Sequence, residues 1–134
     1  MTRKQARELV MKILYEMEIK DEFSTSILEA YSSYKDDSEY SYISSSILSV
    51  IKNITFIDEL ITKNLKGWDK LRISKVDLSI LRNSINEIFF MDDIPTSVSI
   101  NEAVDLAKKY SYEDSYRFVN GLLGTIVKEK SDDF

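Results

Sequence analysis

Two residue types are missing from this 134-residue chain, and two others are scarce. It contains no cysteine and no histidine, only three glycines and a single proline. Without cysteine and histidine, the chain cannot form a thiol nucleophile, a Ser-His-Asp triad, a zinc finger or a histidine metal site. The scarcity of glycine and proline argues against a fold of many strands, because tight turns between strands depend on these residues. The absence of cysteine also fits a reducing compartment.

Long apolar runs are absent as well. No stretch of about 18 uncharged apolar residues occurs, so the sequence predicts no membrane span. The apolar residues 9–15 follow a basic start, but Lys12 interrupts them and Glu16 ends them. No small-residue cleavage site follows, which argues against a secretory signal. We therefore expect the protein to be cytoplasmic and to make no contact with a membrane.

The remaining candidates for catalysis or metal binding have simpler explanations. The acidic pairs at residues 36–37, 92–93 and 132–133 lie in expected breaks or in the tail, where aspartate is a common turn residue. No glycine-rich phosphate loop is present. Residues 121–124 match the GXXG spelling of KH domains but lie within a helical pattern without neighbouring strands. We expect neither an enzyme nor a bound metal or cofactor.

What the chain does contain is a helical pattern along most of its length. Hydrophobic residues make up 43% and charged residues 31%, which is typical of a globular protein, and the length suits one domain over residues 1–134. Apolar residues recur at helical spacing. The predicted helices cover residues 2–19, 26–34, 40–67, 74–91, 99–110 and 111–127, with a kink or break near 53–55. The sequence therefore predicts an all-α, single-domain bundle of six or seven helices in two layers.

Polar residues mark where several of these helices begin. The first side chain of each pair can accept a hydrogen bond from the backbone N–H three residues later. The predicted pairs are Thr2 with Gln5, Ser74 with Asp77, Ser99 with Glu102, and Ser111 with Asp114. Outside the helices, residues 68–73 are expected to form a connector, and residues 128–134 a charged, frayed tail.

Charge is distributed unevenly along the chain. The formal net charge of −5 opposes sequence-independent nucleic-acid binding, which depends on many cations that neutralise phosphates. The first twelve residues nevertheless carry Arg3, Lys4, Arg7 and Lys12 against a single acid, Glu8. Arg3 and Arg7 are one turn apart, so they should project from one side of the first helix. This strip is either a solvated helix face or a phosphate-binding site. Cations in a first turn oppose the helix dipole, which favours a functional cause.

The last helical pattern offers a second candidate contact for nucleic acid. Phe118 lies beside Arg117 and Asn120, and an exposed ring there could stack on a base of single-stranded RNA. Its position on the apolar stripe favours a place in the core instead. Gly121 in mid-helix is unfavourable by about 1 kcal/mol relative to alanine, which indicates close approach by another helix or by a ligand.

The C-terminal half carries more specific motifs. INEAVDLAK at residues 100–108 is followed by FVNG at residues 118–121, and Ile94-Pro95, residues 80–82 and Glu87 precede them. With the basic first helix, this combination resembles the NusB family over nearly the whole chain. The resemblance implies a NusB-like all-α fold and a role in processive transcription antitermination, notably in ribosomal RNA operons. The implied partners are NusE (a small-subunit ribosomal protein), single-stranded boxA RNA in nascent transcripts, and RNA polymerase with other Nus factors.

Carried over by position, the resemblance also implies two groups of functional residues. RNA would contact Arg3, Lys4 and Arg7 at the start of the chain and Phe118 and Asn120 in the FVNG segment. NusE would contact Asp114, with Tyr15 and Asp77 on the same face. An alternative function is a self-associating protein-interaction module, a homodimer in which the basic strip is occluded.

Overall fold

The computed structural model describes residues 1–65 and 73–133, and every regular element in these two ranges is a helix. The elements are α1 (Arg3–Lys20), the 3-10 helix η1 (Thr25–Tyr34), α2 (Tyr40–Lys63), α3 (Lys75–Phe90), α4 (Thr96–Tyr110) and α5 (Ser115–Asp133). None of these helices in the described ranges is long and apolar enough to cross a membrane. The predicted all-α class is confirmed.

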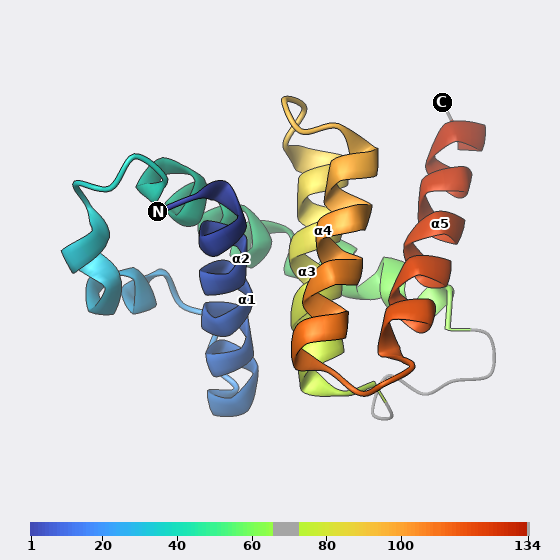
Figure 1. The fold of residues 1–134 in the computed structure, drawn as a ribbon, viewed down its shortest axis with the longest axis horizontal. Coiled ribbons are helices and arrows are strands. Elements are labelled where there is room, and N and C mark those ends of the chain that lie inside the picture. Colours follow the sequence, from blue (N-terminus) through green and yellow to red (C-terminus); the bar gives the residue numbers. More distant parts are fainter. Residues whose placement is uncertain (66–72, 134) are drawn as a thin grey trace.

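The helices form two groups that α2 connects. Figure 1 shows α1 and η1 on one side, α3, α4 and α5 side by side on the other, and α2 passing behind both. α3 is central, because it contacts α1, α2, α4 and α5. Its residues 77–88 are all buried, including several polar side chains. The two groups are the two layers of the predicted bundle.

The apolar stripes expected from sequence spacing form the core. The fully buried residues of α1 are Ala6, Val10, Ile13, Leu14 and Met17, and the buried apolar residues of α5 are Val119, Leu122, Leu123 and Ile126. Helical side chains three and four positions apart share one face, so these residues bury a continuous strip of each helix. This burial holds α1 against α2 and α3, and α5 against α3 and α4.

Two predicted helix starts and the predicted kink are confirmed. The Thr2 side chain accepts a hydrogen bond from the Gln5 N–H at 3.1 Å, and the Thr2 N–H donates to Gln5 Oε1 at 2.8 Å, which completes a capping box. The Ser74 hydroxyl accepts the backbone N–H of Asp77 at 3.0 Å. α2 is kinked at Asn53, where φ is −110° and ψ is 17°.

Two other predicted helix starts, at Ser99 and Ser111, are wrong. α4 begins at Thr96, directly after Pro95, whose carbonyl accepts the Ser99 N–H at 3.2 Å. Ser99 therefore lies inside the helix, and its hydroxyl donates to the buried carboxylate of Glu87 at 2.7 Å. Ser111 ends α4 as its C-cap residue. In both cases the serine hydroxyl donates a hydrogen bond to a carboxylate on another helix and does not cap the start of a helix.

The remaining differences concern the segments between and after the long helices. α5 extends to Asp133, so the prediction of a frayed tail from residue 128 is wrong. The Lys130 ammonium donates to the Ile88 carbonyl at 3.2 Å and lies 5.2 Å from the centroid of the Phe89 ring, which holds the end of α5 in place. The helix predicted over residues 26–34 is η1, interrupted at Tyr31. The predicted connector at residues 68–73 lies outside the described residues except for its last position.

Candidate nucleic-acid interface

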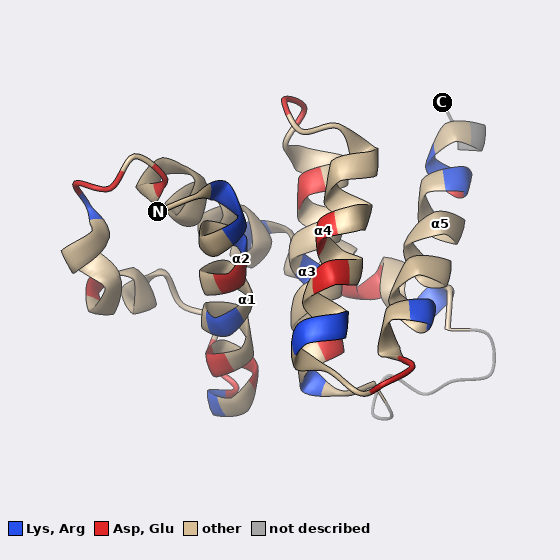
Figure 2. Cartoon of the chain, viewed as in Figure 1, with Lys and Arg blue, Asp and Glu red and all other residues tan. Residues whose placement is uncertain are grey.

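The first turn of α1 carries accessible cations. The capping box at Thr2 fixes this turn, and the turn contains no acidic residue that would complement the helix dipole. Figure 2 shows the basic residues at the start of α1, close to the N-terminus. Arg3 and Lys4 expose 42% and 62% of their side-chain surface. Both are accessible from the surface.

Arg7 does not share this exposed surface, although it is one turn from Arg3. Its side chain is only 7% exposed, and its guanidinium donates to both carboxylate oxygens of Glu87, at 2.9 and 3.3 Å. Burial opposes the charged form, but the hydrogen bond and the charge of Glu87 raise the pKa of Arg7 overall. Arg3 and Arg7 do project from one side of α1, because both guanidinium groups lie over the Tyr42 ring, 4.4 and 5.6 Å from its centroid. Arg7 is nevertheless not part of an exposed strip, because it faces a buried carboxylate on α3.

Glu87 is the centre of a buried polar network that joins four helices. Besides Arg7 on α1, it accepts hydrogen bonds from the Tyr42 hydroxyl on α2 and the Ser99 hydroxyl on α4. Burial and the negative charge of Glu87 raise the pKa of Tyr42, so its hydroxyl stays protonated and donates. These hydrogen bonds between helices fix where the first half of α1 lies. Sequence reasoning reaches Glu87 only through the family motif and misses Tyr42, which carries no distinctive spacing.

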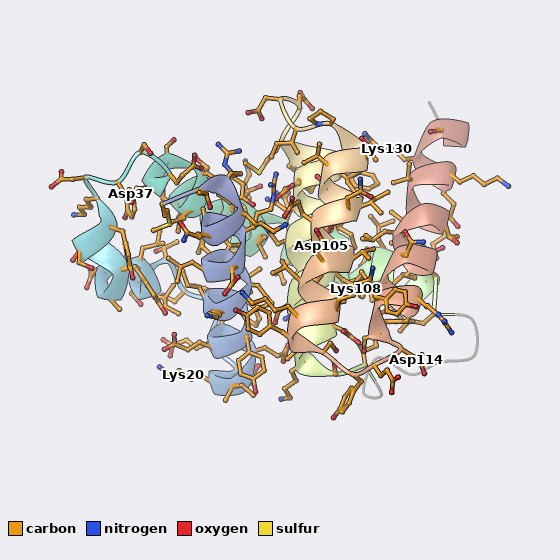
Figure 3. All side chains as sticks on the ribbon, in the orientation of Figure 1. Lys20, Asp37, Asp105, Lys108, Asp114 and Lys130 are labelled. Atoms are coloured by element: carbon orange, nitrogen blue, oxygen red, sulfur yellow. The ribbon has the colours of Figure 1, made fainter. Side chains whose placement is uncertain are left out.

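Arg3 and Lys4 reach acidic residues of other elements. Arg3 pairs with Glu39, the residue before α2, at 2.5 Å. Lys4 bridges two carboxylates of α4, Glu102 and Asp105, at 3.2 Å each. Figure 3 labels Asp105 on α4 among the side chains of this region. Lys4 and these two acids border a groove of about 320 Å³ between α1 and α4.

The FVNG segment lies on α5, away from the N-terminal cations. Figure 1 shows α3 and α4 between α1 and α5. Phe118 is half-buried and packs against the core, as its place on the apolar stripe predicts, whereas Asn120 is exposed. Gly121 is exposed as well, and a Cβ added to it would meet nothing within 4 Å. Of the two expected reasons for this glycine, close approach by another helix of the described chain is therefore excluded.

Tyr15 lies at an apolar depression on the surface. It is 40% exposed and lines a cavity of about 180 Å³ together with Val76 and Tyr110. A neighbouring groove of about 460 Å³ is lined by the same three residues and continues to Tyr112, which is 75% exposed. We call this surface, formed by Tyr15, Val76, Tyr110 and Tyr112, the tyrosine groove. Its exposed aromatic rings suit contact with another macromolecule.

The two acids expected beside Tyr15 differ in position. Asp77 is buried at the start of α3 and accepts a hydrogen bond from the Ser111 hydroxyl at 2.7 Å. Ser111 itself lines the tyrosine groove, so Asp77 supports the groove from inside. Asp114 is exposed immediately before α5, where Figure 3 labels it, and lies 3.8 Å from Arg117. Sequence reasoning misses Tyr112. The one sequence feature that could have indicated it is its aromatic ring close to an expected helix boundary.

These features define the class of protein. The described residues contain no group of three or more acidic, histidine or cysteine side chains that could hold a metal ion. They offer an exposed cationic helix end and an aromatic groove, both of which suit binding to other molecules. The chain is thus a small all-helical binding protein.

Comparison with known proteins identifies the family. The model of the NusB family matches residues 4–128. The chain is 48% identical to the transcription antitermination protein NusB of Acetivibrio thermocellus, over 97% of this chain and 91% of that relative. It is 43% identical to the protein of the same name from Clostridium novyi, over 96% of this chain and 99% of the relative. The chain belongs to the NusB family. The relatives' names describe a role in transcription and no enzymatic activity, in agreement with the expectation from the sequence.

Solved structures agree with this assignment. T. maritima NusB matches with a TM-score of 0.87 and 37% identity, over 96% of this chain and 92% of that one. A crystal structure of the antitermination factors NusB and NusE in complex with dsRNA contains a chain that matches with a TM-score of 0.80 and 28% identity, over 95% of this chain and 96% of that one. The NusB-like fold expected from the motifs is confirmed.

Proposed function

We propose that this protein is a transcription antitermination factor, an RNA-binding adaptor that binds boxA RNA in nascent transcripts together with NusE. Ribosomal RNA operons are the expected setting, and the complex joins RNA polymerase and other Nus factors in the cytoplasm. The observation that carries the proposal is the similarity of the fold, over 95% of this chain, to a chain in a crystal structure of NusB and NusE in complex with dsRNA. The names of the relatives support the same role.

RNA binding is assigned to two surfaces of the molecule. Arg3 and Lys4 supply exposed cations for phosphates, while Phe118 and Asn120 supply a ring and an amide for bases. Arg7 acts from inside, because its buried ion pair holds α1 in place. Each phosphate that a protein neutralises on a single strand contributes about −0.7 to the log–log salt slope, so Arg3 and Lys4 give about −1.4. Binding by this acidic protein alone is therefore weak.

NusE is assigned to the tyrosine groove. Exposed tyrosines are frequent anchors of interfaces, because they combine a large apolar ring with a polar hydroxyl. Asp114 lies two residues beyond Tyr112 and offers a charge to a cationic partner. A bound NusE that also contacts the RNA raises the overall affinity through multivalent contact.

A titration tests this function. Labelled boxA RNA and a scrambled control are titrated with the protein alone and with NusE from the same organism. We expect weak binding by the protein alone and tight, boxA-selective binding when NusE is present. Equal affinity for the two RNAs, measured with folded protein and a competent NusE, would reject the function and leave family membership unchanged.

A second candidate function is self-association as a homodimer. The observation that favours it is an exposed aromatic cluster on α2 and α3. Phe56 contacts Phe89 and Phe90 edge-on, with ring centroids 5.5 and 5.6 Å apart, and Phe56 and Phe90 are both exposed. Light scattering over a range of concentrations tests this function, and a monomer at every concentration removes it.

A further inference from the structure

The cations at the start of the chain are paired with carboxylates from other elements. The pairs are the α-amino group with Asp37 at 2.8 Å, Arg3 with Glu39 at 2.5 Å, Lys4 with Glu102 and Asp105 at 3.2 Å each, and Arg7 with Glu87 at 2.9 Å. These acids belong to the segment before α2, to α3 and to α4. The fold itself therefore neutralises the basic strip that the first residues suggest.

The pairs differ in how readily an RNA phosphate can replace the carboxylate. Arg7 and Glu87 are both buried, so a phosphate cannot reach them without disruption of the bundle. Arg3 and Lys4 are exposed. Exposed ion pairs contribute little to stability and are screened by salt, so an RNA phosphate can displace the carboxylate at these two positions.

Lys4 is the clearest case of an exchangeable pair. Glu102 and Asp105 are three residues apart on α4 and so lie on one face of that helix. Their hydrogen bonds, that of Asp105 first, raise the pKa of Lys4, so the side chain remains an ammonium group. Rotation of the Lys4 side chain alone releases the ammonium from both acids, without movement of α1 or α4.

We propose that Glu39, Glu102 and Asp105 set the RNA affinity of this protein as internal competitors. In the free protein they occupy the donors of Arg3 and Lys4 that RNA phosphates take in the complex. This inference rests on the proposed function. Carboxylate and phosphate oxygens accept the same charge-assisted hydrogen bonds, so a phosphate that takes a donor already bound to a carboxylate must displace that carboxylate.

The competition favours RNA that a partner also holds. An RNA that contacts only the N-terminal cations gains little from exchanging one oxygen acceptor for another. An RNA already bound to NusE makes the exchange as an intramolecular step, at a high effective concentration. The three acids therefore disfavour binding of RNA that is not held by NusE, but they permit binding of RNA in the complex with NusE.

Internal competition has a distinctive dependence on salt. Salt screens both the internal ion pairs and the contacts with phosphate, because the cation of each pair is exposed. In the wild-type protein these two effects partly cancel, whereas a variant without the acids has only phosphate contacts for salt to weaken. The affinity gained by removing the acids is therefore largest at low salt and declines as salt rises.

Substitution of the two α4 acids tests this proposal. Glu102→Gln/Asp105→Asn is compared with Glu29→Gln/Glu59→Gln, which removes two exposed carboxylates from η1 and α2 and gives the same net charge. Affinity for labelled boxA RNA is measured with NusE at about 50 mM and about 500 mM salt. We expect the α4 variant to bind about three- to tenfold more tightly than the control at the lower salt, and within about twofold of it at the higher. Thermal unfolding verifies that each variant is folded.

Lys4→Gln makes the test specific. Added to Glu102→Gln/Asp105→Asn, it should cancel the gain in affinity, because no ammonium is left to release. A gain that persists without Lys4, or that the control variant equals, overturns the proposal while the RNA-binding function stands. Absence of binding by the wild type and by the α4 variant, with competent NusE, rejects the proposed function together with this inference.

Discussion

Arg3 and Arg7 are the same residue type on the same helix, one turn apart, yet one lies at the surface and the other inside the protein. Arg3 makes an exposed pair with Glu39, whereas Arg7 binds the buried carboxylate of Glu87. One turn of helix is about 5.4 Å, which is enough to move a side chain from the rim of the bundle into its interior. The fold thus buries one arginine in an ion pair that stabilises it and keeps the other at the surface.

Removal of Glu87 has the largest expected effect on the stability of the fold. Glu87→Ala leaves the Arg7 guanidinium buried without its partner, so we expect the free energy of unfolding to fall by about 3–5 kcal/mol in urea titrations. Arg7→Met/Glu87→Met should lose less, because no unpaired charge remains in the interior. Equal losses in the two variants would contradict the importance of the buried pair.

The exposed cations should show the opposite behaviour. For Arg3→Gln/Lys4→Gln we expect the free energy of unfolding to change by less than about 1 kcal/mol. The affinity for boxA RNA should fall about tenfold at low salt, and the salt slope should become shallower by at most about 1.4, because salt also screens the carboxylates that the phosphates replace. Titration and thermal unfolding measure the two quantities on the same samples. Lys20→Gln/Lys35→Gln removes two other exposed cations as a control, and an equal loss of RNA affinity there would argue against a local site.

The same division explains which parts of the fold the sequence could predict. The helices follow from apolar spacing, and the capping box at Thr2 follows from residues that are neighbours in the chain. Ser99 with Glu102 satisfies the same local pattern, but the Ser99 hydroxyl is taken by Glu87, twelve residues away on another helix. Local rules therefore succeed where the partner is local and fail where a buried charge elsewhere decides.

The same distinction between local and tertiary partners applies to the residues of the candidate site. Arg3 and Lys4 could be recognised as surface cations, because charge at an exposed helix start needs no knowledge of other helices. Asp77 could not be recognised as buried, since its hydroxyl donor, Ser111, is supplied by the end of α4. The tyrosine groove was equally inaccessible to sequence reasoning, because α1, α3 and the segment after α4 must meet before Tyr15 and Tyr112 share a surface.

Glu8 is a half-buried carboxylate on α1, and its substitution gives a smaller expected effect than that of Glu87. The Tyr110 hydroxyl and then the Lys109 ammonium donate to its carboxylate, and these bonds lower the pKa of Glu8 below its usual value of 4.5. A lowered pKa in the folded state stabilises the fold at pH above 4.5, and this stabilisation is lost as pH falls through the folded-state pKa.

Unfolding experiments over a pH series measure this effect. We expect Glu8→Gln to be less stable than the wild type by about 1 kcal/mol at neutral pH, and the difference to vanish at low pH as the wild-type carboxylate takes up its proton. Glu29→Gln, on the exposed surface of η1, controls for the loss of one charge. A difference that persists at low pH would assign the effect to packing and not to the ionised carboxylate.

Substitution of Gly121 gives the smallest expected effect on stability. It also distinguishes most directly between a role of this position in folding and a role in ligand binding. Gly121→Ala and Gly124→Ala should each raise the free energy of unfolding by about 0.5–1 kcal/mol, because alanine favours a helix and a Cβ at either position meets nothing within 4 Å. If RNA approaches α5 closely beside Phe118 and Asn120, Gly121→Ala alone should weaken boxA binding. Thermal unfolding and RNA titration of this matched pair measure both properties. A stability gain without any loss of RNA affinity would mean that RNA does not approach α5 at Gly121, and the RNA surface would then reduce to the cations of α1.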